Sequence, residues 1–313
     1  MQRIGFLVSP GFQMMSFAAL SVFEFANFTA GEQLYDLRVV SEAGGSVRNS
    51  IGMAIETDAF DEPDFDTLIA CGTPQAGPST PGVLAYIRRA LGQSRRVASI
   101  CTGAFVLAEA GLLDGRRATT HWANARDLQA RYPRIKVDED RIFIVDGSVW
   151  TSAGMTAGVD LALGMVEEDH GAELARSVAR KLVVYHRRGG GQSQHSTLLD
   201  LDAKSDRIQT ALSYARGNLR EPLSVEQLAD AAHLSPRQFS RAFRAETGQS
   251  PAKAVENLRL EAARLMMEQG RHPVDVVARE TGFADRERMR RAFLRAFGQP
   301  PQAIRRAVRE AMM

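Results

Sequence analysis

The sequence predicts an α/β domain with a mostly parallel sheet, followed by an all-α domain. Three observations predict this arrangement. The chain has 313 residues, a length that suits two domains of about 100–200 residues each. Over residues 1–185, short strand-like apolar runs alternate with longer helix-period segments, which is the pattern of βαβ units. From about Ser205 onward, every readable segment is helical.

The composition is that of an ordinary globular protein. Hydrophobic residues make up 44% of the sequence and charged residues 24%, which supplies enough apolar side chains for real cores. No apolar run approaches the roughly 18 residues that a membrane helix needs, and the stretch from Met1 to Val8 indicates a strand rather than a signal peptide. Cys71 and Cys101 are the only cysteines. We therefore expect no disulfide framework, no membrane contact and a cytoplasmic location.

Short β-branched and apolar runs predict the strands of the sheet, at Ile4–Val8, Leu37–Ser41, Thr67–Cys71 and Val97–Ile100. Helix-period segments lie between or after them, at about 14–29, 81–92, 103–110 and 156–185. Two further runs, Ile142–Val145 and Val149–Ser152, flank Asp146-Gly147-Ser148, which is a turn signal for a β-hairpin.

The residue composition and the net charge of the chain both change near residue 190. The polar, glycine-rich stretch 187–196 indicates the start of a linker, so we expect domains at 1–187 and 205–313 joined by a linker at 188–204. Residues 1–200 carry 19 basic and 23 acidic side chains, whereas residues 201–313 carry 20 and 14. An acidic body with a basic tail domain is one pattern of nucleic-acid binders.

Cys101 lies where the run Val97–Ile100 gives way to a helix-period segment. A strand, a sharp turn and a helix form an arrangement like a nucleophile elbow, and we expect the helix N-terminus to lower the pKa of the thiol. A lone cysteine at a strand end is often purely structural, so the functional interpretation depends on its neighbours. Ligands in open α/β sheets bind at the carboxyl ends of strands. The expected ligand site comprises Cys101, Thr102, His121, Gly72 and Thr73.

The helical domain contains an internal repeat with a spacing of about 50 residues. Each copy predicts a helix, a short turn and a second helix, and the stretch 257–265 predicts a long helix that joins the copies. Ser235-Pro236 is a helix start, with a hydroxyl cap and proline at the first helical position, and Asp285 is expected to cap the second copy in the same way. The alternative to a DNA-binding domain is a pair of amphipathic helical hairpins whose arginines are only solvated. The repeat, with matching caps and cores in both copies, argues against this alternative.

The second helix of each copy has a buried face and a charged face. Phe239 and Phe243 are four residues apart, as are Met289 and Phe293, so each pair shares one face. Arginine on the opposite face can pair with guanine edges or phosphates of double-stranded DNA. The expected DNA-binding residues are Arg237, Gln238, Ser240, Arg241, Arg244, Arg286, Glu287, Arg290 and Arg291.

These features resemble those of known families. The repeat, with Ala278–Phe283 and Phe297–Pro301, resembles the double helix-turn-helix domain of the AraC family. The stretch from Cys101-Thr102-Gly103 to His121-Trp122 resembles the PfpI-type, class I glutamine amidotransferase-like family, which implies a flavodoxin-like sandwich. Together they resemble GlxA-like regulators, which implies a sequence-specific transcription activator that binds successive major grooves. The resemblance also implies a homodimer, RNA polymerase as a partner, and a small nitrogenous metabolite as effector.

The sequence departs from the enzymes of that superfamily in one respect. Those enzymes place an acidic residue after the first strand, whereas this chain has Met14-Met15-Ser16 there, and Glu24 is the nearest acid. Without that acid the groups needed for hydrolase chemistry are incomplete, so we expect no catalytic residues, no cofactor and no metal. Two alternatives stay open: a redox switch at Cys101, and a cysteine-dependent hydrolase or amidotransferase with a DNA-binding tail.

Overall fold

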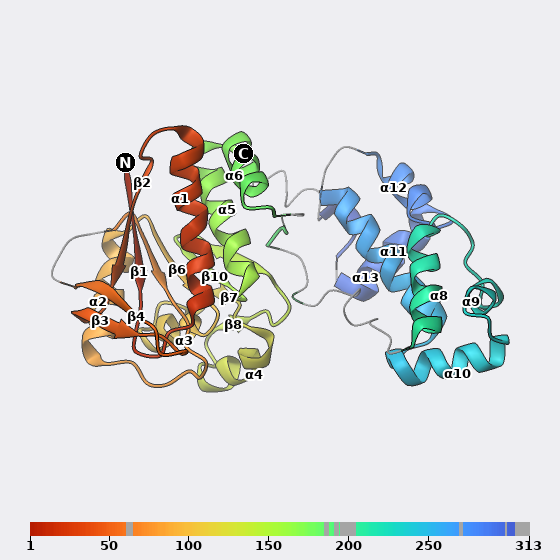
Figure 1. Cartoon of the computed structure of the whole chain (residues 1–313), viewed down its shortest axis with the longest axis horizontal. Helices are drawn as coiled ribbons and strands as arrows, with labels where there is room; N and C mark the ends of the chain where they lie inside the picture. Colours follow the sequence, from red (N-terminus) through yellow and green to blue (C-terminus); the bar gives the residue numbers. More distant parts are fainter. Residues whose placement is uncertain are drawn as a thin grey trace. The chain divides into compact units, whose positions relative to one another are not determined.

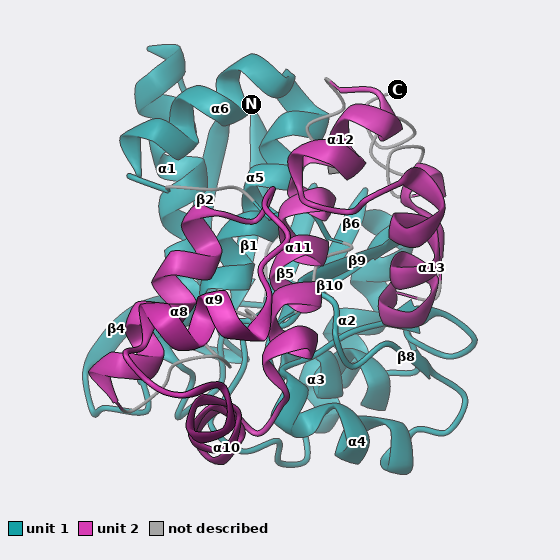
Figure 2. Cartoon of the chain, turned by 90° about the vertical axis from the view of Figure 1, so that its right-hand side faces the viewer, with its two compact units in different colours: residues 1–194 teal, residues 195–313 magenta. Residues whose placement is uncertain are grey.

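The computed structural model describes residues 1–60, 65–184, 188–190, 194, 205–268, 272–297 and 299–303. The chain divides into two compact units, residues 1–194 and residues 195–313, which are coloured separately in Figure 2. Each unit has hydrophobic cores of its own.

Unit 1 is built on one sheet that has eight strands among the described residues, in the order β3-β4-β2-β1-β5-β6-β10-β9 (Figure 1). The central strands pair in parallel, whereas β3 with β4 and β9 with β10 pair antiparallel. The mostly parallel sheet and the predicted hairpin are therefore confirmed. The strands span Gln2–Leu7 (β1), Tyr35–Val40 (β2), Ala43–Arg48 (β3), Ala54–Ala59 (β4), Thr67–Ala70 (β5), Arg96–Ile100 (β6), Phe143–Asp146 (β9) and Val149–Ser152 (β10).

Helices cover both faces of this sheet. Successive residues of a strand point to opposite faces, and apolar side chains on both faces are buried against helices. Phe6 packs with the helices of one face and Leu7 with those of the other. The first face carries α1 (Ala18–Ala30), α5 (Thr156–His170) and α6 (Ala172–Lys181), and the second carries α2 (Pro81–Gln93), α3 (Gly103–Glu109) and α4 (Trp122–Arg131). The flavodoxin-like sandwich is confirmed.

Some elements differ from the sequence expectation. The segment expected as one helix at 156–185 is two helices, because Gly171, with φ +89°, interrupts it. The helix expected from residue 14 begins as a 3-10 turn, η1 (Met14–Phe17). The β3–β4 hairpin, α4 and the short pair β7 (Arg117–Ala118) and β8 (Lys136–Val137) were not predicted. The side chains of β3 are mostly exposed, so β3 lacks the apolar alternation that marks a half-buried strand.

Unit 2 consists of two helix-turn-helix halves that share one long helix. Val255 and Leu258 of that helix belong to the first core, and Ala263 and Met267 belong to the second. The joining helix and the all-α double helix-turn-helix domain are therefore confirmed. The helices span Asp206–Gly217 (α8), Val225–Ala231 (α9), Pro236–Thr247 (α10), Pro251–Glu268 (α11), Val274–Glu280 (α12) and Arg286–Phe297 (α13).

The expected caps are present in both halves. The Ser235 hydroxyl accepts a hydrogen bond from the backbone N–H of Gln238, and the Gln238 side chain accepts one in return from the Ser235 backbone. In the second half, Asp285 Oδ1 accepts from the backbone N–H of Arg288 at 2.7 Å. These local bonds satisfy helix N–H groups that would otherwise lack a partner.

Candidate ligand site and DNA-binding surface

Cys101 occupies a strained turn between β6 and α3, as the elbow pattern predicts. Its φ is +57°, a left-handed conformation that costs energy in a residue with a side chain. Two glycines allow the close approach: a Cβ on Gly154 would lie 2.2 Å from Cys101 Cβ, and a Cβ on Gly103 would lie 2.2 Å from the Ala70 carbonyl oxygen. The Cys101 backbone is fixed at both ends, by N–H donation to Ser152 O at 3.1 Å and by acceptance from Thr120 Oγ1 at 2.8 Å.

Thr102 joins the turn after β6 to the turn after β5. Its hydroxyl accepts from the Thr73 N–H at 2.8 Å and donates to the Thr73 carbonyl at 2.6 Å. Gly72 lies against the same hydroxyl, since a Cβ there would approach Thr102 Oγ1 to 2.7 Å. Gly72, Thr73, Cys101 and Thr102 are thus gathered at the carboxyl ends of two strands. The Thr102 side chain is buried and holds the turn together.

The thiol of Cys101 differs from the sequence expectation. Only 4% of Cys101 is exposed, and burial raises the pKa of its thiol, although hydrogen bonds from Thr102 act in the opposite direction. The expected lowering of this pKa by the helix N-terminus is therefore wrong, because desolvation of the thiolate outweighs the donors. The other cysteine, Cys71, is also buried, and burial raises the pKa of its thiol to about 12.

His121 is at the rim of this turn. It is half-buried and serves as the N-cap of α4, where Nδ1 accepts from the Ala123 N–H at 3.3 Å. Its ring lies 5.5 Å, between centroids, from that of Trp122, which is 51% exposed. The preceding residue, Thr120, bonds to the Cys101 carbonyl, so His121 is linked to the elbow through the backbone.

Gln194 is a residue of this site that sequence reasoning missed. Its Nε2 donates to the carbonyls of Thr120 and Arg141 at 2.8 and 3.1 Å, and its Oε1 accepts from the Trp122 N–H at 2.8 Å. Its backbone N–H donates to Asp140 Oδ1 at 2.9 Å. No local pattern marks this glutamine within the polar stretch 187–196, so only the fold brings it beside His121.

The environment of the elbow limits its chemistry. Glu24, the nearest acid in the sequence after the first strand, is exposed on α1, and Met14 and Met15 of η1 are also exposed. The described part of the chain has no group of three His, Cys, Asp or Glu side chains that could hold a metal ion. No helix in that part is long and apolar enough to cross a membrane.

On α10 the arginines face outward, opposite the buried Phe239 and Phe243. Arg237, Arg241 and Arg244 are exposed, and Ser240 is half-buried. Gln238 is exposed, but its side chain is part of the capping box with Ser235. Three of the six exposed residues of this helix are thus arginines.

On α13 the exposed residues are not equivalent. Arg290 donates to both carboxylate oxygens of Glu287 at 2.9 Å, and this hydrogen bonding lowers the pKa of Glu287. Arg286 is 3.9 Å from Asp275. Arg291 is exposed and forms no ion pair with any residue that the structure describes. Arg288, which the sequence pattern did not single out, is also exposed on this helix, with its side chain 66% accessible.

Comparisons with known proteins cover both units. The DJ-1/PfpI family matches residues 2–168, and a helix-turn-helix domain matches residues 228–307. The HTH-type transcriptional regulator GbdR of Pseudomonas aeruginosa is 31% identical over 96% of this chain and 83% of its own length. The HTH-type transcriptional regulator GlxA of Rhizobium meliloti is 32% identical over 97% of this chain and 96% of its own.

Two further similarities concern the first unit. An isonitrile hydratase of Pseudomonas putida is 39% identical over 140 residues, which are 44% of this chain and 60% of that enzyme. The crystal structure of an AraC family transcriptional regulator from Pseudomonas putida superposes with a TM-score of 0.53 at 22% identity, covering 58% of this chain and 100% of that one. At that identity, the superposition shows the fold alone.

Proposed function

The chain belongs to the DJ-1/PfpI family and is an HTH-type transcriptional regulator of AraC type, and from this premise we propose that it is an activator controlled by a small nitrogenous metabolite. The effector would bind the α/β domain at 1–187, and the domain at 205–313 would read DNA, with 188–204 as the linker. The proposed effector residues are Cys101, Thr102, His121, Gly72 and Thr73, and the proposed DNA residues are Arg237, Gln238, Ser240, Arg241, Arg244, Arg286, Glu287, Arg290 and Arg291.

The observation that carries the proposal is the position of Gln194. This residue ends the described part of unit 1, and its amide is bonded in the loop of Thr120 and Trp122. The same loop contains His121 and is bonded to the Cys101 turn. A ligand that competes for these backbone groups would change the position of Gln194, and the chain that follows leads to the DNA-binding unit.

Such a ligand acts only through its different affinities for two states of the protein. In the first state, Gln194 is bonded to the loop as the structure describes. In the second state, the effector takes some of those bonds and Gln194 is released. An effector that favours the second state shifts the population of DNA-competent protein by the ratio of its two affinities.

The test is a thermal-shift screen of the full chain against amino acids, amines and betaines, followed by DNA-binding titrations with each compound that stabilises it. At a concentration of about 100 times Kd, an effector stabilises the protein by about 2.7 kcal/mol. His121→Asn removes the imidazole but keeps a good N-cap residue, so it should lose the stabilisation and keep the fold. Gln194→Ala should keep ligand binding and lose the ligand's effect on DNA binding. Equal stabilisation of wild type and His121→Asn would refute the proposed site.

We further propose that the protein is a cytoplasmic homodimer that binds paired half-sites and contacts RNA polymerase. The similarity to HTH-type transcriptional regulators supports the DNA partner, and the dimer and the polymerase contact rest on the family resemblance. Sedimentation of the full chain tests the dimer, and transcription in a reconstituted system with purified polymerase tests activation. A monomer at cellular concentration would contradict the dimer and leave the effector site unaffected.

The two alternatives differ in their support. Redox sensing needs an accessible, low-pKa thiol, and the burial of Cys101 with its raised pKa weighs against it. A cysteine-dependent enzyme has one observation in favour, the similarity of unit 1 to an isonitrile hydratase. Purified protein that converts an isonitrile or an amide, and loses that turnover in Cys101→Ser, would establish it over the proposal that the chain is not an enzyme.

A further inference from the structure

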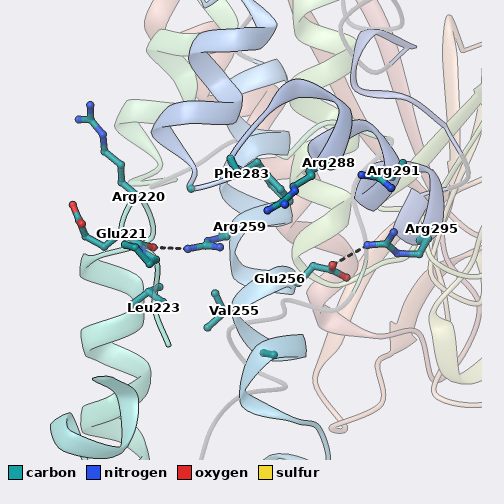
Figure 3. A pocket seen from close by; sticks show the side chains of 14 residues that line it. Arg220, Glu221, Leu223, Val255, Glu256, Arg259, Phe283, Arg288, Arg291 and Arg295 are labelled. Carbon is teal, nitrogen blue, oxygen red and sulfur yellow. Dashed lines mark hydrogen bonds and ion pairs between the residues drawn. The ribbon is translucent and has the colours of Figure 1, made fainter. Parts of the chain in front are cut away.

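A cleft of about 750 Å³ lies within unit 2, between its two helix-turn-helix halves (Figure 3). The loop between α8 and α9 forms one wall, and the first half of α11 forms another. The turn before α13 and one flank of α13 complete it. Leu223, Val255 and Phe283 are nearly buried and give the cleft an apolar floor.

The charged residues of the cleft are mostly arginines. The side chains that line it include Arg220, Arg259, Arg288, Arg291, Arg295, Glu221 and Glu256, which is an excess of three positive charges. Arg295 is neutralised by Glu256, at 2.9 Å between Nη2 and Oε2. Among the described residues, Arg288 has one ion-pair contact, at 3.7 Å from Asp285. Arg291 has no ion pair within 4 Å among them, although its charge helps to lower the pKa of Glu287. The cleft therefore presents at least two guanidinium groups that an anion can reach.

The width of the cleft is fixed by contacts across the two halves. Arg259 of α11 donates from Nε to the Leu219 carbonyl at 3.0 Å and from Nη2 to the Glu221 carbonyl. The turn between α12 and α13 packs on the same point, since a Cβ at Gly282 would lie 1.8 Å from Leu219 O. Arg220 also pairs with Glu280 at 3.4 Å. A cleft held in this way binds its ligand without the cost of first being ordered.

The position of the cleft relates it to DNA. A duplex that contacts both α10 and α13, as the proposed function requires, spans the two halves of unit 2. Arg291 lies both on the outward face of α13 and in the lining of the cleft. Between two successive major grooves, a duplex presents sugar and phosphate groups, which bind arginine side chains in a register that does not depend on sequence.

We propose that this cleft binds the sugar–phosphate backbone of DNA between the two recognition helices, with Arg288 and Arg291 donating to phosphate oxygens. The deoxyribose rings would lie against the apolar floor. The inference rests on the proposed DNA-binding function and adds Arg288 to the residues that perform it. The two flanks of α13 then have different roles. Arg288 and Arg291 line the cleft, whereas Arg290 on the other flank is bonded to Glu287.

The test uses the full chain and a mixed-sequence duplex of about 30 base pairs, with affinity measured by fluorescence anisotropy over a range of salt concentrations. Each lost phosphate contact reduces the slope of log K against log salt by about 0.9, so Arg288→Gln should reduce it by about that amount and the double variant with Arg291→Gln by about twice as much. Arg288→Lys should keep the slope, because an ammonium also binds phosphate as a point charge. Arg207→Gln is the matched control, because Arg207 is exposed on α8, outside the cleft and outside the proposed DNA-binding residues.

The outcomes separate this inference from the function on which it rests. If Arg288→Gln leaves the slope of wild-type binding unchanged, or changes it no more than Arg207→Gln does, the cleft site alone is overturned. If Arg288→Gln alters which bases are selected from a random library, the cleft site is also overturned, because that result assigns Arg288 to base reading. A wild-type protein that binds no duplex would overturn the DNA-binding function and the cleft together. Melting curves of all variants should match the wild type, since Arg288 and Arg291 are exposed.

Discussion

Replacing Gly282 with alanine should disrupt the contact that holds the two halves of unit 2 together. Gly282 has φ +76°, and a Cβ there would lie 1.8 Å from the Leu219 carbonyl oxygen and 2.7 Å from Arg259 Nε. Neither neighbour is free to move, because the carbonyl accepts the hydrogen bond from Arg259. The methyl group therefore has to displace either the backbone of the α8–α9 loop or the guanidinium that is bonded to it.

The magnitude follows from two separate costs. A left-handed backbone conformation costs a residue with a Cβ about 1–2 kcal/mol. Loss of a hydrogen bond to a charged group costs about 1.5–3 kcal/mol. Gly282→Ala should therefore destabilise unit 2 by about 2.5–5 kcal/mol. For a domain of this size that corresponds to a fall in Tm of at least about 10 °C.

Gly248 is the matched control. It caps α10 with φ +74°, and a Cβ there would meet nothing within 4 Å. Gly248→Ala should therefore lower the free energy of unfolding only by the cost of the left-handed backbone conformation, about 1–2 kcal/mol. Scanning calorimetry of the full chain measures both variants, and the transition that moves on addition of duplex DNA belongs to unit 2. Equal losses in the two variants would refute the proposed contact, because the backbone conformation alone would then account for both.

Three other predictions follow from buried and paired charges. Arg96→Met should cost about 1–3 kcal/mol in urea unfolding, because it removes the 2.6 Å partner of the buried Asp169 carboxylate but leaves Arg95 at 2.7 Å; a loss of about 3–5 kcal/mol, as for a buried charge with no partner left, would contradict this. The raised pKa of Cys71, about 12 against an ordinary 9.0, gives stability that is complete below about pH 9 and declines as pH rises towards the folded-state value, since the unfolded thiol ionises first; Cys71→Ser should flatten that alkaline decline, and an identical decline in the variant would exclude this origin. Glu287→Gln should raise affinity for mixed-sequence DNA at low salt, because it frees Arg290 from its bidentate pair and removes a negative charge; unchanged affinity would mean that this flank of α13 stays away from the duplex.

The sequence by itself determined the elements whose signals are local. Ser235 and Asp285 cap helices through bonds to residues three positions away, and the repeat reveals two similar halves because each carries its own core pattern. The turn at Cys101 was also predictable, since a strand, a short turn and a helix are contiguous in the chain. Such features depend on residues close together in sequence, where spacing and residue type are sufficient evidence.

Only the tertiary structure decided which groups meet across the fold and how their charges are used. Gln194 bonds to a loop that lies more than 70 positions away, and Gly282 packs on the Leu219 carbonyl from the other half of unit 2. The thiol of Cys101 is less acidic than its helix suggests because burial, which no local pattern reports, outweighs the nearby donors. The physical reason is the same in each case: desolvation and long-range contact depend on the packing of distant segments, and the sequence near a residue does not specify that packing.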